Sequence, residues 1–129
     1  MSLRGARGIG AWGEEQCRAF LKRQGYHIIE ANFRTRRGEI DIIARVSLEG
    51  EAFLCFIEVK TRTNLLSLPE YATEVRKRQK IYRAAVEYCV SRCIDLDAIR
   101  IRFEHISLYV DRSLGRLRFQ KRLLPIISS

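Results

Sequence analysis

The sequence predicts one α/β domain in which a mixed sheet of about five strands is flanked by helices. Segments with apolar residues at helical spacing and segments with strand-like spacing follow in the order helix, three strands, helix, two strands. The chain of 129 residues has 47% hydrophobic residues and two prolines, which favours one compact core. We therefore treat residues 1–129 as a single domain, of which residues 1–9 are expected to be disordered or derived from cloning.

The N-terminal half is predicted to begin with a helix and a strand. Residues 10–24 carry small or apolar residues near every 3.6 positions, and Gly25 supplies a C-terminal stop signal. Residues 26–33 alternate weakly and fit a first strand. An arginine-rich connection over residues 34–37 leads to the second strand.

The C-terminal half is predicted to contain a second helix and two strands. Pro69 fits the first turn of the helix, and residues 81–89 carry an apolar stripe at i, i+3, i+4, i+7 and i+8. The apolar phase of residues 98–110 changes near His105, which indicates either a bulge or a strand buried on both sides. Residues 117–124 either pair back as a hairpin or form an exposed edge that dimerises.

Four charged residues interrupt the apolar central segment of residues 38–62, which otherwise predicts two buried strands joined as a hairpin. They are Glu39, Asp41, Glu58 and Lys60. Because side chains alternate along a strand, Glu58 and Lys60 are expected on one side of theirs. An antiparallel register exists in which Asp41, Glu58 and Lys60 meet at one point.

Alternation also places Ile40 and Ile42 together on the side opposite Asp41. Buried carboxylates need a cation, a metal ion or a shifted pKa. Two converging carboxylates favour a hard divalent ion such as Mg²⁺, and a neighbouring lysine could orient a water for phosphodiester hydrolysis. The alternative is a solvated edge strand in which Asp41 pairs with an arginine.

The ordered motifs resemble a known family. Asp41 followed by Glu58-Val59-Lys60 looks like the active-site signature of the PD-(D/E)xK nuclease superfamily. Together with further motifs, the chain from about Gly10 to Val110 closely resembles the YraN-type family of small bacterial proteins, which is similar to archaeal Holliday junction resolvases. These motifs are Gly13-Glu14, Gly25-Tyr26, Asn32, Gly38-Glu39-Ile40-Asp41-Ile42-Ile43-Ala44 and Glu58-Val59-Lys60-Thr61-Arg62.

The resemblance implies a restriction-endonuclease-like fold and a metal-dependent endonuclease acting on DNA, including branched or structured DNA. Asp41, Glu58 and the Val59 carbonyl would bind Mg²⁺ or Mn²⁺, and Lys60 would orient the attacking water. Glu14 would assist at the metal, although it could instead be a first-turn glutamate favoured by the helix dipole. Glu39 would be auxiliary.

The charge balance indicates a polyanionic partner. Lys plus Arg number 24 against 15 acidic residues, giving a net charge of +9 and a pI of about 9.9, and nucleic acid is favoured over a membrane surface. We expect Arg36, Arg37, Arg62 and Lys77 to hold phosphates, with solvated side chains as the alternative. Lys80 is expected on the outward face of the second helix.

Other functional classes stay open. A non-catalytic nucleic-acid-binding module could keep the same fold and basic surface, and a protein-interaction partner with simply paired acids is a third reading. A homodimer is expected if two strands are cut. The family usually carries Arg-Phe-Asp where this chain has Arg102-Phe103-Glu104, so the role of Glu104 is left undecided.

The expected compartment is the cytoplasm. No apolar run approaches the ~20 residues needed to span a bilayer, and the basic start is not followed by the apolar region of a secretory signal. The four cysteines are expected to be reduced core thiols rather than a zinc site at Cys89 and Cys93. His27 and His105 are expected to be structural.

Overall fold

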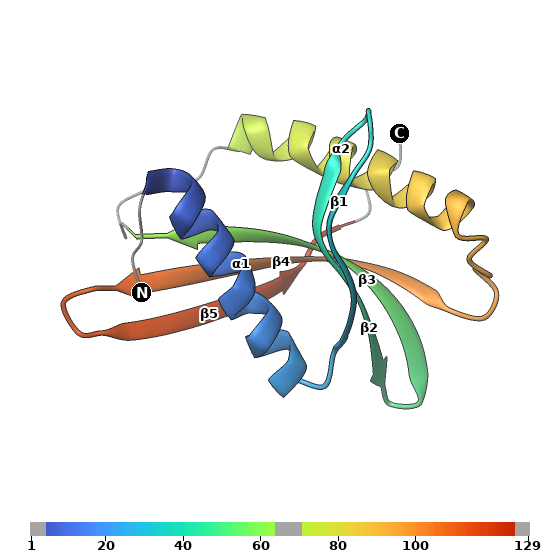
Figure 1. Ribbon diagram of the computed structural model, residues 1–129. Coiled ribbons are helices and arrows are strands. Elements are labelled where there is room, and N and C mark those ends of the chain that lie inside the picture. Colours follow the sequence, from blue (N-terminus) through green and yellow to red (C-terminus); the bar gives the residue numbers. More distant parts are fainter. Residues whose placement is uncertain (1–4, 64–70, 126–129) are drawn as a thin grey trace.

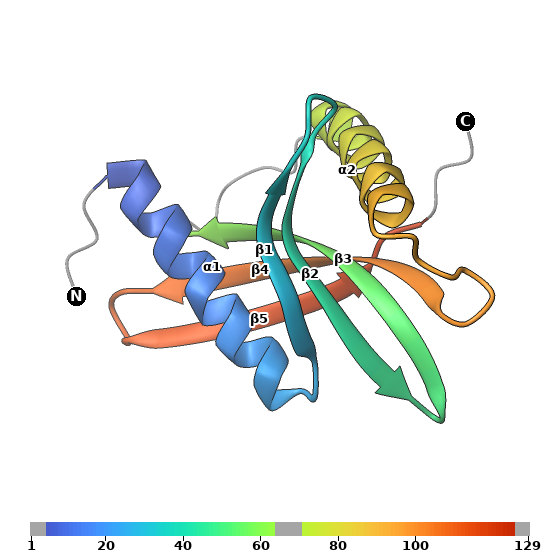
Figure 2. The ribbon, with the colours of Figure 1, turned by 45° about the vertical axis from the view of Figure 1, so that its right-hand side comes forward.

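The computed structural model describes residues 5–63 and 71–125, with side chains described for residues 8–63 and 76–125. Five strands form one mixed sheet in the order β1-β2-β3-β4-β5, in which β3 and β4 are parallel and the other neighbours antiparallel. One helix covers each face (Figures 1 and 2), so the predicted α/β class is confirmed and is consistent with a restriction-endonuclease-like fold. The elements are α1 (Gly5–Arg23), β1 (His27–Arg34), β2 (Glu39–Leu48), β3 (Glu51–Arg62), α2 (Tyr71–Ser91), β4 (Arg100–Asp111) and β5 (Arg116–Leu123).

Helix α1 begins five residues before the predicted Gly10, so residues 5–9 are helical and the prediction of disorder there is wrong. Glycines lower helix propensity by only ~1 kcal/mol each, and tertiary packing overrides such a preference. The predicted stop is confirmed: Gly25 has φ 92°, and the Tyr26 N–H donates to the carbonyl of Leu21 at 2.9 Å.

Two apolar cores lie on opposite faces of the sheet. Buried Cys17 and Leu21 of α1 pack on one face, and the predicted α2 stripe, including Ile81 and Tyr88, packs on the other. The predicted helix start at Pro69 lies outside the described residues. Within those residues, neither helix combines the length and apolarity needed to cross a membrane.

The predicted central hairpin is formed by β2 and β3. Its two-residue turn places Glu49 at φ 49° and Gly50 at φ 84°, the left-handed geometry that suits a tight hairpin with twisted strands. The strands pair from Leu48 opposite Glu51 back to Ile42 opposite Ile57. The hairpin register therefore places the N-terminal end of β2 beside the C-terminal end of β3.

Beyond Ile42 and Ile57 the two strands separate, and we call this opening the fork. Residues 39–41 of β2 pair with β1, while residues 58–62 of β3 pair with β4. Figure 1 shows the β1–β2 hairpin bending toward α2 as β3 continues in another direction. Asn32, which lies opposite Asp41 in the β1–β2 register, has φ 55° at this bend.

The bend corrects one prediction about strand faces. Ile42 packs in the α1 core, whereas Ile40 packs in the α2 core with Ile43, so Ile40 and Ile42 do not share a face. Strict alternation fails because the β1–β2 hairpin rotates toward α2 where it leaves β3. Asp41 occupies the position at which the direction changes.

The structure resolves the alternative for β4, and it shows that β5 pairs back while also forming an edge of the sheet, so dimerisation through β5 stays a prediction. β4 is buried on both sides from Phe103 to Leu108 and pairs without interruption with β3 and β5, so the phase change is two-sided burial and not a bulge. β5 pairs back on β4 as a hairpin from Arg116 to Leu123.

Glu104, whose role was undecided, is a fully buried carboxylate in β4. The Tyr26 hydroxyl lies 2.9 Å from both of its oxygens, and Lys121 Nζ lies 3.2 Å from Oε2. Lys121 also donates to the Tyr26 oxygen, and Arg102 Nε lies 3.9 Å from Oε1. Glu104 therefore connects β4 to β5 and to Tyr26, which lies between α1 and β1, and it has a structural role on the α1 face.

Replacing Glu104 with alanine should lower the free energy of unfolding by about 3 kcal/mol, because it leaves Tyr26 and Lys121 without their buried acceptor. Urea denaturation would measure the change. The matched control is Glu51→Ala, which removes an ion pair with Arg100 between exposed side chains and should cost less than about 1 kcal/mol. Equal losses in the two variants would contradict the structural role.

Candidate functional site

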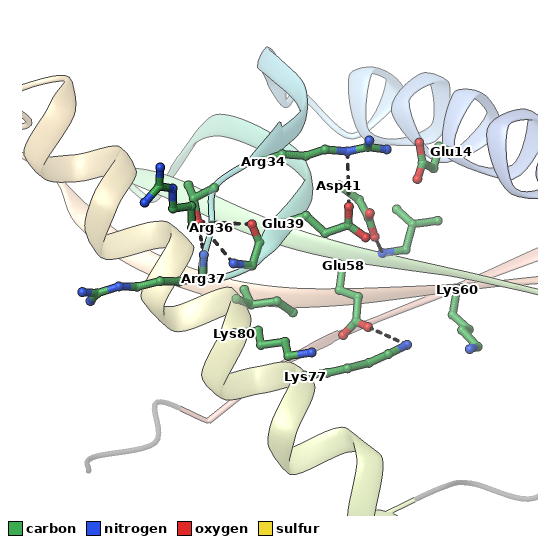
Figure 3. A pocket seen from close by; sticks show the side chains of 14 residues that line it. Glu14, Arg34, Arg36, Arg37, Glu39, Asp41, Glu58, Lys60, Lys77 and Lys80 are labelled. Carbon is green, nitrogen blue, oxygen red and sulfur yellow. Dashed lines mark hydrogen bonds and ion pairs between the residues drawn. The ribbon is translucent and has the colours of Figure 1, made fainter.

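A cavity of about 560 Å³ lies at the fork between β2 and β3 (Figure 3). Its walls come from α1, β2, β3, α2 and the β1–β2 loop. Four carboxylates and six basic side chains line it, with apolar and backbone contributions from four more residues. The lining residues are Glu14, Arg34, Thr35, Arg36, Arg37, Gly38, Glu39, Asp41, Glu58, Val59, Lys60, Lys77, Lys80 and Ile81.

Asp41 lies where the backbone ladder between β2 and β3 stops. The Val59 N–H donates to Asp41 Oδ2 at 2.8 Å, so a side-chain carboxylate replaces the lost strand pairing. Burial raises the pKa of Asp41 from 3.8 to about 7, against the lowering effect of the Val59 hydrogen bond. The nearby carboxylates Glu14, Glu58 and Glu39 raise this pKa further.

Glu58 and Lys60 project from the same side of β3 (Figure 3), as strand alternation predicts. The side chain of Glu58 is 16% exposed, and its Oε1 lies 3.6 Å from Lys77 Nζ on α2. β3 lies inside the sheet between β2 and β4, so the solvated edge-strand alternative is wrong. Glu39 pairs with Arg34 at 3.4 Å, whereas Asp41 accepts from the Val59 backbone.

Glu14 reaches the cavity from α1. Because α1 begins at Gly5, Glu14 lies in the third turn and not in the first, so the helix-dipole alternative does not apply. The preceding Gly13 allows close packing on β3: a Cβ there would lie 2.9 Å from the Thr61 Cβ and nearer still to its hydroxyl. The missing side chain therefore brings Glu14 toward Asp41, as Figure 3 shows.

The β1–β2 loop is positioned by a second close contact. Thr35 Oγ1 accepts hydrogen bonds from the N–H groups of Arg37 and Gly38, which closes a tight turn. A Cβ on Gly38 would lie 2.9 Å from the Lys80 carbonyl carbon, so the loop packs directly on the α2 backbone. Arg37 Nε lies 3.7 Å from Glu87 of α2.

Nearly all predicted site residues line this one cavity, and Arg62 is the exception among them. Lys80, expected on the outward face of α2, is exposed and also lines the cavity. Its i, i+3 spacing from Lys77 places both lysines on one helix face and could have indicated this. Arg34 also lines the cavity from the end of β1, as expected for the three arginines Arg34, Arg36 and Arg37 of the arginine-rich connection before β2.

Part of the cavity lining is of the kind that a hard divalent cation prefers. Asp41 and Glu58 carry carboxylate oxygens, Val59 lies between them along the lining, and repulsion among the carboxylates around Asp41 would be relieved by positive charge. In the described part of the chain, no three His, Cys, Asp or Glu side chains are grouped closely enough to hold an ion. Glu58 is turned toward Lys77.

The fold and site define an α/β protein with a mixed sheet, consistent with a restriction-endonuclease-like fold and with acidic and basic residues gathered where two strands separate. Residues 13–108 match the Uncharacterised protein family UPF0102. The chain belongs to this family, which confirms the expected YraN-type membership.

Curated relatives of the same family cover most of the chain. A UPF0102 protein of Acetivibrio thermocellus is 40% identical over 109 residues, covering 82% of this chain and 78% of the relative. A UPF0102 protein of Chlorobium phaeobacteroides is 42% identical over 103 residues, covering 79% and 76%. A third, from Alkaliphilus oremlandii, is 39% identical over 101 residues, covering 78% and 83%.

Alanine substitutions at two glycines of α1 should have opposite effects. Gly13→Ala should lower the free energy of unfolding by about 1–3 kcal/mol, because the new methyl group overlaps Thr61. Gly10→Ala is the matched control: nothing lies within 4 Å of its Cβ, so it should stabilise by up to about 1 kcal/mol. Chemical denaturation measures both, and a stabilising Gly13→Ala would show that α1 does not approach β3 closely.

The raised pKa of Asp41 predicts a pH-dependent stability. Between pH 4 and 7 the folded protein holds a proton that the unfolded chain has released, so the free energy of unfolding should fall as the pH rises. Asp41→Asn should remove this fall and be more stable than wild type at pH 8 by about 2–4 kcal/mol. The exposed Asp97→Asn is the control and should keep the wild-type profile, and a flat wild-type profile would contradict the buried carboxyl.

Proposed function

We propose that this protein is a Mg²⁺- or Mn²⁺-dependent endonuclease that hydrolyses phosphodiester bonds of DNA. The observation that carries the proposal is the convergence of Asp41, Glu58, Val59 and Lys60 on one cavity at the fork, with Glu14 beside them. Burial and then the neighbouring carboxylates raise the pKa of Asp41. Such an arrangement is costly to fold and is typical of functional sites.

The residues have separate roles in this proposal. Asp41, Glu58 and the Val59 carbonyl hold the divalent ion, with Glu14 and Glu39 as auxiliary carboxylates. When bound, the ion supplies Lewis-acid polarisation of the phosphate and a more acidic water. The Lys60 ammonium group orients the attacking water and offsets the negative charge that develops on the phosphate.

The basic side chains around the carboxylates support a nucleic-acid substrate. Arg34, Arg36 and Arg37 extend from the β1–β2 hairpin on one side of the cavity, and Lys77 and Lys80 extend from α2 on another (Figure 3). These cations would hold phosphates on either side of the cleaved bond, a mode of recognition that reads backbone shape and not base sequence. Branched or structured DNA fits this mode.

A second candidate is a non-catalytic module that binds nucleic acid with the same surface. The ion pair of Glu58 with Lys77 favours it, because this contact occupies a carboxylate that metal binding would need. In the nuclease proposal, Glu58 turns from Lys77 toward Asp41 and Lys77 is released to the phosphates. Metal-dependent turnover separates the two candidates.

The test is a panel of labelled duplex, flap, junction and single-stranded DNA incubated with Mg²⁺, Mn²⁺ or EDTA. Wild type should cleave at least one substrate with either metal ion, and Lys60→Ala should be slower by at least about 100-fold because a charge-stabilising donor is lost. An Asp41→Ala, Glu58→Ala double variant should also lose Mn²⁺ binding in a titration.

The control variant is Lys22→Ala, at an exposed position in the last turn of α1 outside the cavity, and it should cleave at the wild-type rate. All variants are purified identically, so that a contaminating nuclease would appear in every preparation. Metal-independent binding without cleavage of any substrate would favour the non-catalytic module.

A further inference from the structure

Strand β5 carries a row of exposed arginines on one face, which we call the β5 arginine row. It consists of Arg116, Arg118 and Arg122, which alternate along the strand with Leu117 and Lys121. Lys121 turns the other way, to the buried Glu104 on the α1 face. The arginines therefore lie on the opposite face, the one covered by α2 elsewhere in the sheet.

The strand register joins this row to the candidate active site. Arg118 lies opposite Tyr109 of β4, and Tyr109 lies opposite Arg62 of β3. Lys60, a residue of the candidate site, lies two residues before Arg62 on β3 and opposite Ser107 of β4. Lys60 and Arg62 therefore project from the same face of the sheet. One continuous sheet surface therefore runs from the cavity to the edge strand.

The charge of this surface is strongly positive. Arg118 is held above the ring of Tyr109, with its guanidinium carbon 4.7 Å from the ring centre, which presents a planar cation at a set position. α2 lies over the middle of the sheet, and the β4–β5 hairpin extends away from it in both views (Figures 1 and 2). Across residues 58–62, 105–111 and 116–122, this face carries the basic residues Lys60, Arg62, Arg116, Arg118 and Arg122 and the acids Glu58 and Asp111.

We propose that the β5 arginine row binds the phosphate backbone of double-stranded DNA beyond the cleaved bond, a role that rests on the proposed nuclease function. Arg118 lies two strands away from Lys60 across the sheet and two residues away along the strand direction. Standard sheet spacings then give about 12 Å between their Cα atoms. Because each DNA strand has one phosphate per about 3.4 Å of helix axis, the row would contact phosphates some three to four nucleotides from the scissile one.

A second copy of the chain fits this edge poorly. Two β5 strands paired edge to edge in an antiparallel sense would bring the arginine rows close to one another, and like charges on facing strands are destabilising. Basic side chains along an exposed edge are also a common device against strand pairing. A polyanion neutralises the same charges, so the sign and spacing of the row favour DNA.

The test compares two double variants with equal loss of charge. Arg116→Gln, Arg118→Gln removes two cations of the row, and Arg45→Gln, Arg83→Gln removes two exposed cations outside the row and the cavity. Binding of a fluorescent 20-base-pair duplex is measured by anisotropy in EDTA at several salt concentrations. The row variant should bind about 10-fold more weakly at 100 mM salt, with its salt slope reduced by about two.

The control variant should bind within about twofold of wild type, and Arg116→Lys, Arg118→Lys should restore most of the affinity because it keeps the charge. Circular dichroism melting checks that each variant is folded. Equal weakening in both glutamine variants would overturn the proposal, since net charge alone would then explain binding.

Light scattering of wild type and the row variant tests whether a second copy of the chain, and not DNA, binds at the β5 edge. A change of oligomeric state in the row variant would assign the edge to contacts between copies and overturn the proposal. The nuclease function is judged separately, by cleavage with Mg²⁺ or Mn²⁺. If DNA binding depends on the row but no substrate is cleaved, the result supports DNA binding by the row and counts against the nuclease function. If the row variant binds and cleaves DNA as wild type does, the result counts only against DNA binding by the row.

Discussion

The separation of β2 from β3 is the constraint on which the site depends. A sheet interior normally pairs every backbone group, and strands that separate leave polar groups to be satisfied in another way. Here the Val59 N–H is satisfied by the carboxylate of Asp41. The same separation admits a cavity among apolar strands and allows side chains from both to face it. A polar site is thereby placed inside a sheet whose two faces are otherwise covered by apolar cores.

Two carboxylates in this small domain have opposite electrostatic surroundings. Glu104 is fully buried beside Tyr26 and Lys121, so its charge is matched and its contacts connect strands. Asp41 has one backbone donor and three acidic neighbours, and burial, followed by those neighbours, raises its pKa to about 7. The first arrangement stabilises a fold, while the second leaves an excess of negative charge that a cation would relieve. Basic side chains from β1, the β1–β2 loop, β3 and α2 surround that excess and suit it to a polyanionic substrate.

Close backbone approach gives the site its shape. Gly13 lets α1 rest on Thr61, and Gly38 lets the β1–β2 loop rest on the backbone of Lys80. Both contacts join elements that share no hydrogen-bond ladder, so close packing largely sets their separation. The sequence pairs Gly13-Glu14 and Gly38-Glu39 thus each couple a packing residue to a carboxylate at the cavity. Membership of UPF0102 over residues 13–108 spans both pairs.

Local patterns determined much of this protein in advance: the order of elements, the central hairpin and the projection of Glu58 and Lys60 from one side of β3 follow from periodicity, turn residues and alternation. Tertiary structure alone decided that Ile40 leaves the face of Ile42, that β2 and β3 separate beside Asp41, and that Glu104 is buried beside Tyr26. Periodicity describes one element at a time, with regular geometry. These three placements depend on a bend between strands and on contacts between residues up to 78 positions apart, where packing and not local spacing sets the direction of a side chain.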